Sequence, residues 1–342
     1  MKSIIYNVKR RLAFPVYFTI CLLLLSGYGY AQKEKTTEPE KTKTKPKTKA
    51  LKNSFQSVWI TDNQTALVPP KGTLEFDVMH RFGVINNGYK DFYGVFAPSN
   101  IRLGVNYAPI KNLFVGIGLT KSNMLVDGNA KYAIISQAKG KWPVSVSYYG
   151  NIAIDTRKNV DKALFKYSSD RFSYFNQLII ARKLTNKLSV QIAGSHSHQN
   201  SVKGYYTKND SSGKSIYREM RNDHFAISFA ARYKITNVIS LMLNYDQPLT
   251  KHPTNNPNPN FAFGLEMNSS SHSFQIFVGN YYYLNPQRNN LYNTNNPFGY
   301  NDASKTHPVR NVDDPKTTKD ESTRVPGGRF VIGFNITRLW SY

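Results

Sequence analysis

A strict alternation of apolar and polar residues runs through most of the chain and constrains its fold more than any other feature. Successive side chains of a strand point to opposite sides, so a period of two predicts strands with one apolar face. The pattern is clearest at the C-terminal end, where six residues fall on one face: Phe330, Ile332, Phe334, Ile336, Trp340 and Tyr342. Something apolar must cover such a face.

About twelve segments of this kind follow residue 72, and the links between them alternate in length. Links after even-numbered strands are hairpin-sized, with sequences APIKN, AKGK, LTNK, ITN and NSSS. Links after odd-numbered strands are longer and polar. An even strand number with this asymmetry is typical of outer-membrane barrels, which have short periplasmic turns and long extracellular loops. We therefore predict that residues 72–342 form an all-β, transmembrane, antiparallel up-and-down β-barrel.

The placement of charge supports lipid as the cover of the apolar faces. No Asp, Glu, Lys or Arg interrupts these faces before Arg338, near the chain end. A Lys or Arg at the bilayer midplane would cost about 2–4 kcal/mol. A soluble β-sandwich also excludes charge from its core, but it does not need alternating link lengths. We expect a monomer that contacts the bilayer and lipopolysaccharide, with Trp340 and Tyr342 at the interface and the last strand recognised by the barrel assembly machinery.

The N-terminal region predicts export to the outer membrane. Residues 1–31 combine basic residues, the apolar run LAFPVYFTICLLLLSG and small residues before a cleavage point, as in a signal peptide. The single cysteine, Cys21, lies in that run, so the mature chain has no disulfide. Residues 32–53 contain eight lysines and read as a disordered basic tether that could contact the cell wall. Residues 54–71 are expected to be a periplasmic segment leading into the barrel.

The formal charge of +24 does not predict nucleic-acid binding. The signal peptide and tether carry much of the excess, and no basic stripe with interleaved aromatic residues stands out in the remainder. No nucleic-acid partner is expected for an exported chain of this kind.

The polar faces of the predicted strands identify a candidate lumen lining of ten residues: Glu75, Asp77, Arg81, Arg102, Asn106, Asp155, Gln191, His224, Arg232 and Glu266. These groups either pair across a narrow lumen and fill it, or line a polar pore. Twelve strands fall between small filled barrels and large water-filled ones, so strand number does not decide. A narrow channel for small solutes is the leading hypothesis. A closed barrel that binds a partner through its loops or tether is the alternative.

No catalytic, cofactor-binding or metal-binding residue is assigned. His196 and His198 share a strand face, but two histidines without a nearby carboxylate make a weak metal site. Ser270 and His272 have the spacing of an outer-membrane phospholipase pair in reversed order and fall in a predicted periplasmic turn. A lipid hydrolase is therefore the remotest alternative.

The link at about residues 285–328 is much longer than the others, and loops of this length are usually functional or disordered. Its first half is rich in tyrosine and asparagine, and its second half is charged. Either the aromatic half folds inward and narrows the lumen, or the whole link is an external flexible loop.

Several stretches together resemble one family: PPKGTLEFDVMHRFG, DFYGVFAPSNIRLGVNYAPIKNLFVGIG, KWPVSVSYYGNIAIDT, FNQLIIARKLTNKLSVQ and the terminal RFVIGFNITRLW. The chain is similar to uncharacterised outer-membrane β-barrels of Bacteroidetes-type bacteria, a domain of unknown function. The long Asn- and Pro-rich link and the two residues after Trp340 depart from that pattern. The resemblance implies the fold and the location, and it implies no activity.

Overall fold

The computed structural model describes residues 54–159, 165, 167–202, 204–209, 213–218, 220–253, 256–297, 300–310, 318–325 and 329–341. The predicted signal peptide, the predicted tether and Tyr342 lie outside these residues.

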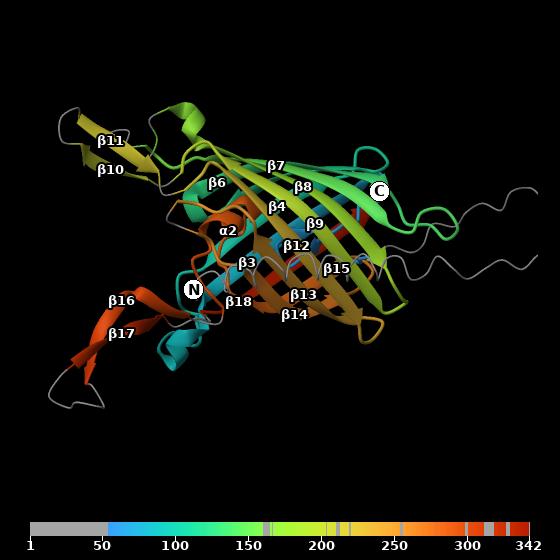
Figure 1. The fold of residues 1–342 in the computed structure, drawn as a ribbon. Coiled ribbons are helices and arrows are strands. Elements are labelled where there is room, and N and C mark those ends of the chain that lie inside the picture. Colours follow the sequence, from blue (N-terminus) through green and yellow to red (C-terminus); the bar gives the residue numbers. More distant parts are fainter. Residues whose placement is uncertain are drawn as a thin grey trace, which may run out of the picture. The chain divides into compact units, whose positions relative to one another are not determined.

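Twelve antiparallel strands close into a barrel (Figure 1), which confirms the predicted fold class and strand number. The strands are β3 (Thr73–Val84), β4 (Asn100–Tyr107), β5 (Leu113–Thr120), β6 (Leu125–Ile135), β7 (Ser145–Asp155), β8 (Phe172–Lys183), β9 (Leu188–Gln199), β12 (Asp223–Lys234), β13 (Ile239–Pro248), β14 (Asn260–Asn268), β15 (His272–Gly279) and β18 (Val331–Ser341). The first and last strands pair, from Ser341 opposite Thr73 to Val331 opposite Val84, and leave no open edge.

The links define two ends of the barrel. At the short-turn end, five turns of three to nine residues join β4–β5, β6–β7, β8–β9, β12–β13 and β14–β15. The other links meet at the long-loop end. One of them departs from the predicted pattern: β5 and β6 are joined by residues 121–124 only, which contain the short helix η2 (Ser122–Met124). The strand begins at Leu125 although its residues Gly128 and Asn129 have low β propensity.

The long loops contain further elements. Two short helices are η1 (Ile85–Asp91) and η4 (Ser168–Arg171), and the long link after β15 holds α2 (Pro286–Tyr292). Two hairpins form separate two-stranded sheets that the sequence analysis did not predict, β10 (Gly204–Asn209) with β11 (Gly213–Arg218) and β16 (Tyr300–Arg310) with β17 (Thr318–Val325). In the described part of the chain, no helix is long and apolar enough to cross a membrane.

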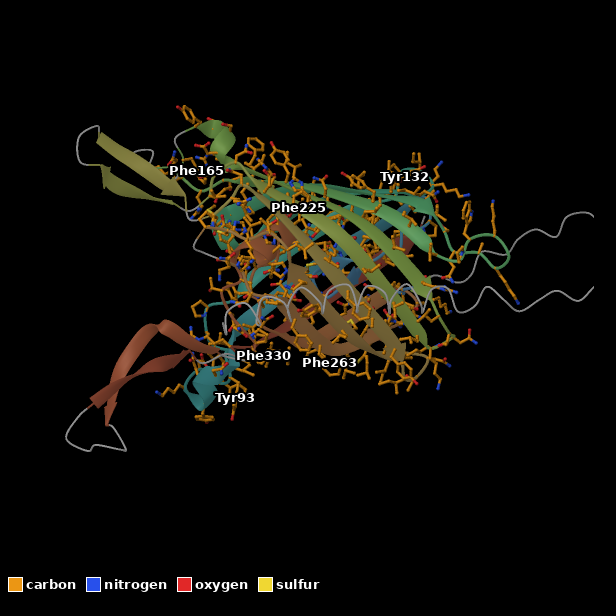
Figure 2. All side chains as sticks on the ribbon, in the orientation of Figure 1. Tyr93, Tyr132, Phe165, Phe225, Phe263 and Phe330 are labelled. Atoms are coloured by element: carbon orange, nitrogen blue, oxygen red, sulfur yellow. The ribbon has the colours of Figure 1, made fainter. Side chains whose placement is uncertain are left out.

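The outer wall of the barrel is apolar. Buried and exposed residues alternate along each strand, as in β14, and the exposed positions carry large apolar side chains such as Phe225, Phe263 and Tyr132 (Figure 2). In β18, Ile336 is exposed, and Ile332, Phe334 and Trp340 are partly exposed on the same face. The Arg338 guanidinium lies 4.8 Å from the centre of the Trp340 ring, near the short-turn end. The face of the terminal strand is therefore turned outward.

The lumen is occupied by the chain's own N-terminal segment. Residues 55–66, here called the plug segment, are buried except for Gln56 and contain a small hairpin of β1 (Trp59–Ile60) and β2 (Asn63–Gln64). This differs from the expectation that residues 54–71 form a periplasmic lead-in. The segment mixes apolar and amide side chains, and each kind has a matching partner on the inner wall. Sequence periodicity does not reveal such partners.

Candidate functional site

All ten predicted lumen residues are buried, with exposed fractions of 5% or less. They lie on the inner side of the wall, opposite the apolar faces. They do not form one cluster. Four of them form a charged network on β3 and β4, and three others, Arg81, Arg232 and Glu266, take part in two separate ion pairs. Gln191 contacts the plug segment, and Asp155 and His224 lie near the long-loop end.

Arg102 is the centre of the charged network. Its guanidinium donates to Asp77 at 2.8 Å and to both carboxylate oxygens of Asp127 at 2.8 and 3.0 Å. Asn106 donates to Asp77 at 2.8 Å and to Glu75 at 3.2 Å. A buried Arg between carboxylates compensates charge that would otherwise be costly in this setting. This network joins β3, β4 and β6 across the inner wall.

Small residues beneath Arg102 make room for it. A methyl group at Gly118 would overlap the Arg102 guanidinium, and one at Gly104 would overlap Asp77. A methyl group at Gly116 would overlap the Asn106 amide. The three glycines on β4 and β5 therefore let the charged side chains lie flat against the wall.

Two further ion pairs lie where the wall meets the N-terminal segment. Arg81 on β3 pairs with Asp62 of the plug segment, and both side chains are buried. Arg81 also donates to Asn335 at 3.1 Å and lies 4.4 Å from the centre of the Phe277 ring. On β12, Arg232 pairs with Glu266 and donates to the Gln56 side chain.

Amide side chains of the wall hold the middle of the plug segment. Asn63 donates to Asn244 at 2.9 Å and to Asp246 at 2.6 Å, and it accepts from Gln177 at 3.2 Å. Backbone groups of the segment are also bonded to wall side chains: Trp59 and Thr61 to Gln275, Thr61 to Asn335, Gln64 and Ala66 to Gln191, and Ala66 to Ser147. The plug segment thus uses inner-wall side chains in place of the backbone partners of a sheet.

Apolar side chains fix both flanks of the plug segment. Phe55 and Ile60 belong to a buried cluster with inner-wall residues that include Tyr149, Phe175 and Phe277. Val58 and Trp59 pack in a second cluster, together with the wall residues Met79, Ala108 and Phe114 and with Leu284 from the long link. The lumen is therefore filled by a mixed core of hydrogen-bonded amides and apolar groups.

The aromatic half of the long link folds inward at the other end of the lumen, which decides between the two alternatives above. Gln287 of α2 donates to Asn151 of β7 at 2.9 Å, and Asn290 accepts from Asn260 of β14 at 3.0 Å. Tyr281 is buried, and its hydroxyl donates to Thr61 at 3.2 Å. The side chains of residues 298–328 lie outside the description, so the predicted solvation of the charged half stays a prediction.

The two remaining predicted residues lie near the long-loop end. Asp155 accepts from Arg157 at 2.8 Å. His224 stacks on His252 of the β13–β14 loop, with their rings 5.2 Å apart. The Arg221 backbone N–H donates to Nδ1 of His252 at 2.9 Å, so the His252 proton is on Nε2 and points to His224 Nδ1, 3.0 Å away. Burial lowers the pKa of His252, and the charge of Arg221 lowers it further.

The remaining histidines that the sequence analysis considered lie beside polar side chains. Contrary to the sequence reading, a carboxylate does lie beside His196 and His198, because one oxygen of Asp223 on the adjacent strand is 2.8 Å from a ring nitrogen of each. His272 contacts its neighbour Ser271 at 3.2 Å. Within the described ranges, no group of three or more His, Cys, Asp or Glu side chains could hold a metal ion.

Sequence reasoning missed several inner-wall residues that hold the plug segment. Lys131 on β6 is buried and donates to the Gln64 side chain at 2.7 Å and to the Thr65 carbonyl at 3.2 Å. Its strand has apolar residues at both parities because the pairing shifts between Ala133 and Ile135. Before the shift the alternation is regular, and Lys131 is an even number of residues from Asp127 and Leu125. All three therefore lie on the inner face.

A closed barrel with an apolar outer wall, a polar inner wall and a plugged lumen defines a membrane-bound β-barrel protein. The family comparison gives the same class. The chain belongs to the family described as Membrane bound beta barrel domain (DUF5777), whose profile matches residues 55–340. The match begins at the plug segment, so this segment is part of the family domain.

Solved structures with a similar outline include outer-membrane channels. The NanC porin is 12% identical, with 79% of this chain and 99% of that chain covered and a TM-score of 0.41. An outer membrane channel from Pseudomonas putida F1 is 11% identical, with 80% and 97% covered and a TM-score of 0.42. At these values the likeness carries no function to this chain. The search of curated proteins gave no match.

Proposed function

We propose that this protein is an outer-membrane channel for small polar solutes whose lumen is closed by the plug segment. A signal-like N-terminal region supports export, and a membrane-bound barrel in an exported chain fits the outer membrane. In this proposal the long-loop end faces the outside of the cell and the short-turn end faces the periplasm.

The observation that carries the proposal is the way in which the plug segment is held. Its middle is bound through side-chain hydrogen bonds to wall amides such as Asn244 and Gln191. Water can replace bonds of this kind when the segment leaves, because folding exchanges protein–water for protein–protein hydrogen bonds at a small net gain. The wall left behind would carry charged and amide groups suited to a hydrated path.

The connectivity of the plug segment also permits it to leave. Its first residues lie beside Arg232 and Asn268 near the short-turn end, and residue 73 begins β3 at that same end. The segment therefore enters the lumen, turns at Thr61 and Asp62 between β1 and β2, and returns. Both of its ends are at one mouth, so it can withdraw without breaking any pairing between barrel strands.

The alternative is a closed barrel that binds a partner through its loops. The filled lumen favours this reading, as do the two hairpins β10–β11 and β16–β17, which give long loops a defined shape. In that case the plug segment is a permanent core and residues on the inner wall serve stability alone.

Conductance in a planar bilayer separates the two functions. Residues 55–66 are replaced by a Gly-Ser sequence of equal length, and a control replaces the turn residues 109–112 in the same way. The channel proposal predicts a stable ion current for the plug variant and a mainly closed state for the intact chain and the control. A plug variant that is correctly folded, judged by heat-modifiable mobility, and still silent would favour the partner-binding alternative.

A further inference from the structure

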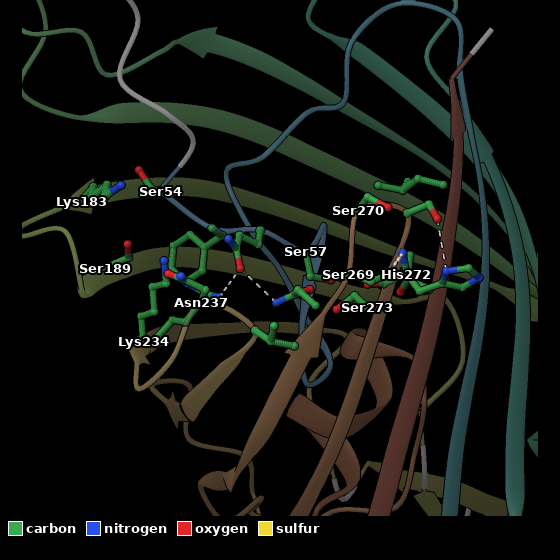
Figure 3. Close-up of a pocket in the computed structure, with 18 of the residues that line it drawn as sticks. Ser54, Ser57, Lys183, Ser189, Lys234, Asn237, Ser269, Ser270, His272 and Ser273 are labelled. Carbon is green, nitrogen blue, oxygen red and sulfur yellow. Dashed lines mark hydrogen bonds between the residues drawn. The ribbon is translucent and has the colours of Figure 1, made fainter.

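A basic cavity of about 570 Å³ lies at the short-turn end, between the start of the plug segment and the barrel wall (Figure 3). Its lining comes from residues 54–57 and from the turns β8–β9, β12–β13 and β14–β15, with Thr337 and Leu339 of β18. Figure 3 shows Lys183 and Lys234 on one side of the cavity and Ser270 and His272 on the other. Its volume is in the range of small-molecule sites.

The charge of the cavity has one sign. Lys183, Lys187, Lys234 and Arg232 line it, and its lining contains no Asp or Glu. The Arg232 charge is already compensated by Glu266. Among the residues that the structure describes, no carboxylate pairs with the ammonium groups of the three lysines. The cavity therefore holds about three uncompensated positive charges at neutral pH.

Polar groups complete the cavity. Gln56 accepts hydrogen bonds from Arg232 and from Asn268, which fixes the floor. Ser273 on β15 lines the cavity and is 7% exposed, and its hydroxyl has no hydrogen-bond partner in the described chain. A buried hydroxyl that lacks a partner costs stability unless something binds it. It supplies a donor that an anionic ligand would satisfy.

The position of the cavity favours a water-soluble ligand over a lipid. Ser189, Arg232, Ser273 and Thr337 are buried positions of the inner wall, opposite the exposed apolar positions of the same strands. A solute approaching the short-turn mouth reaches these groups, whereas a lipid headgroup at the outer wall is separated from them by the barrel wall.

We propose that this cavity binds a small soluble polyanion carrying two or three negative charges, of the phosphate or polycarboxylate class. The inference rests on the proposed channel function and deepens it by naming the solute class. The lysines attract the anion to the mouth, and the serine and asparagine side chains donate to its oxygens beside the plug segment.

Isothermal titration with inorganic pyrophosphate tests the proposal. The full chain without its signal sequence is refolded in a non-ionic detergent, so that no lipid phosphate competes. We expect saturable binding with one ligand per chain. The combined variant Lys183→Gln, Lys187→Gln, Lys234→Gln should bind at least tenfold more weakly. The matched control Lys111→Gln, Lys139→Gln, Lys141→Gln removes the same charge from other short turns and should change affinity less than threefold.

Equal weakening in the two combined variants would show general surface attraction and overturn the proposal. Unchanged binding in both would assign the anion to the tether lysines and also overturn it. Replacing the same three cavity lysines with arginine keeps the charge and should preserve binding within threefold. If the glutamine variant does not fold, Lys234→Gln alone should still weaken binding about threefold. Binding is read without transport. If the intact chain binds pyrophosphate and the variant with residues 55–66 replaced stays silent, the channel is refuted and the cavity is not. If that variant conducts and the intact chain does not bind, the cavity alone is refuted.

Discussion

The Asp62–Arg81 ion pair offers the sharpest test of how the plug segment is held. Asp62→Asn leaves the buried Arg81 guanidinium without its carboxylate. Removing one partner of a buried pair costs about 3–5 kcal/mol. Arg81 keeps the His80 carbonyl at 2.7 Å, Asn335 at 3.1 Å and the Phe277 ring, so we expect the lower end of that range.

This cost falls on docking of the plug segment, because Asp62 belongs to the segment and Arg81 to the wall. About 3 kcal/mol corresponds to an undocked population roughly one hundred times larger. A reporter cysteine in the segment, Val58→Cys, measures this population. Val58 is buried, and the only native cysteine lies in the predicted signal peptide. The rate of reaction with a water-soluble maleimide should rise about one hundredfold in Asp62→Asn.

Asp155→Asn is the matched control. Asp155 also pairs with an arginine, but Arg157 is 36% exposed and the pair does not touch the plug segment. A partly exposed pair contributes about 1 kcal/mol or less, so the labelling rate should change little. Equal labelling rates in the two variants, with a heat-modifiable barrel in both, would refute the idea that the buried pair holds the segment.

Two further predictions concern the wall and the long-loop end. Gly118→Ala should displace the Arg102 guanidinium and lower the free energy of unfolding, measured in urea, by about 1–3 kcal/mol. The control Gly194→Ala should be neutral, because no atom lies within 4 Å of the added methyl group. Equal stabilities of the two variants would show that Arg102 does not need the space above Gly118. Because the pKa of His252 is lowered in the folded protein, the folded loop binds a proton less readily than the unfolded chain does. The loop is therefore most stable at neutral pH, and its stability falls as the pH drops below about 6.5. Hydrogen exchange in residues 249–253, corrected for intrinsic rates, should therefore accelerate at pH 5, and His252→Gln should remove most of this dependence. Identical pH dependence in that variant would exclude His252 as the cause.

The barrel could be predicted from the sequence because its physical signals are local. The alternation in TLEFDVMHRF assigns Phe76 to lipid and Asp77 to the lumen, and both assignments agree with their exposure. Hairpin-sized links fix antiparallel neighbours in the same way. The exceptions are also local: the shifted pairing after Ala133 hides the inner position of Lys131.

The plug segment could not be predicted because its signals are long-range. Asn63 is bonded to residues on β8 and β13, more than one hundred positions away, and no periodicity within VWITDNQTA points to them. The same holds for Asp223, whose carboxylate meets His196 and His198 only after β9 and β12 pair. The position of α2 also depends on long-range partners, because its amide side chains can be buried only when they bond to distant wall residues such as Asn260 and Asn151. The sequence therefore left two alternatives for the long link.

Cross-linking tests whether residues 55–66 occupy the lumen. Asn63→Cys is combined with Asn244→Cys, because the Asn63 amide of the plug segment donates to the Asn244 side chain of the wall at 2.9 Å. A short bis-methanethiosulfonate reagent is added to the barrel in intact membranes. The control combines Asn63→Cys with Tyr245→Cys, the next residue on the strand, which faces outward. We predict a cross-link, seen as a shifted band on a denaturing gel, for the first pair and none for the second. No cross-link in the first pair, with free reaction of the residue-63 thiol from solution, would show that residues 55–66 do not occupy the lumen.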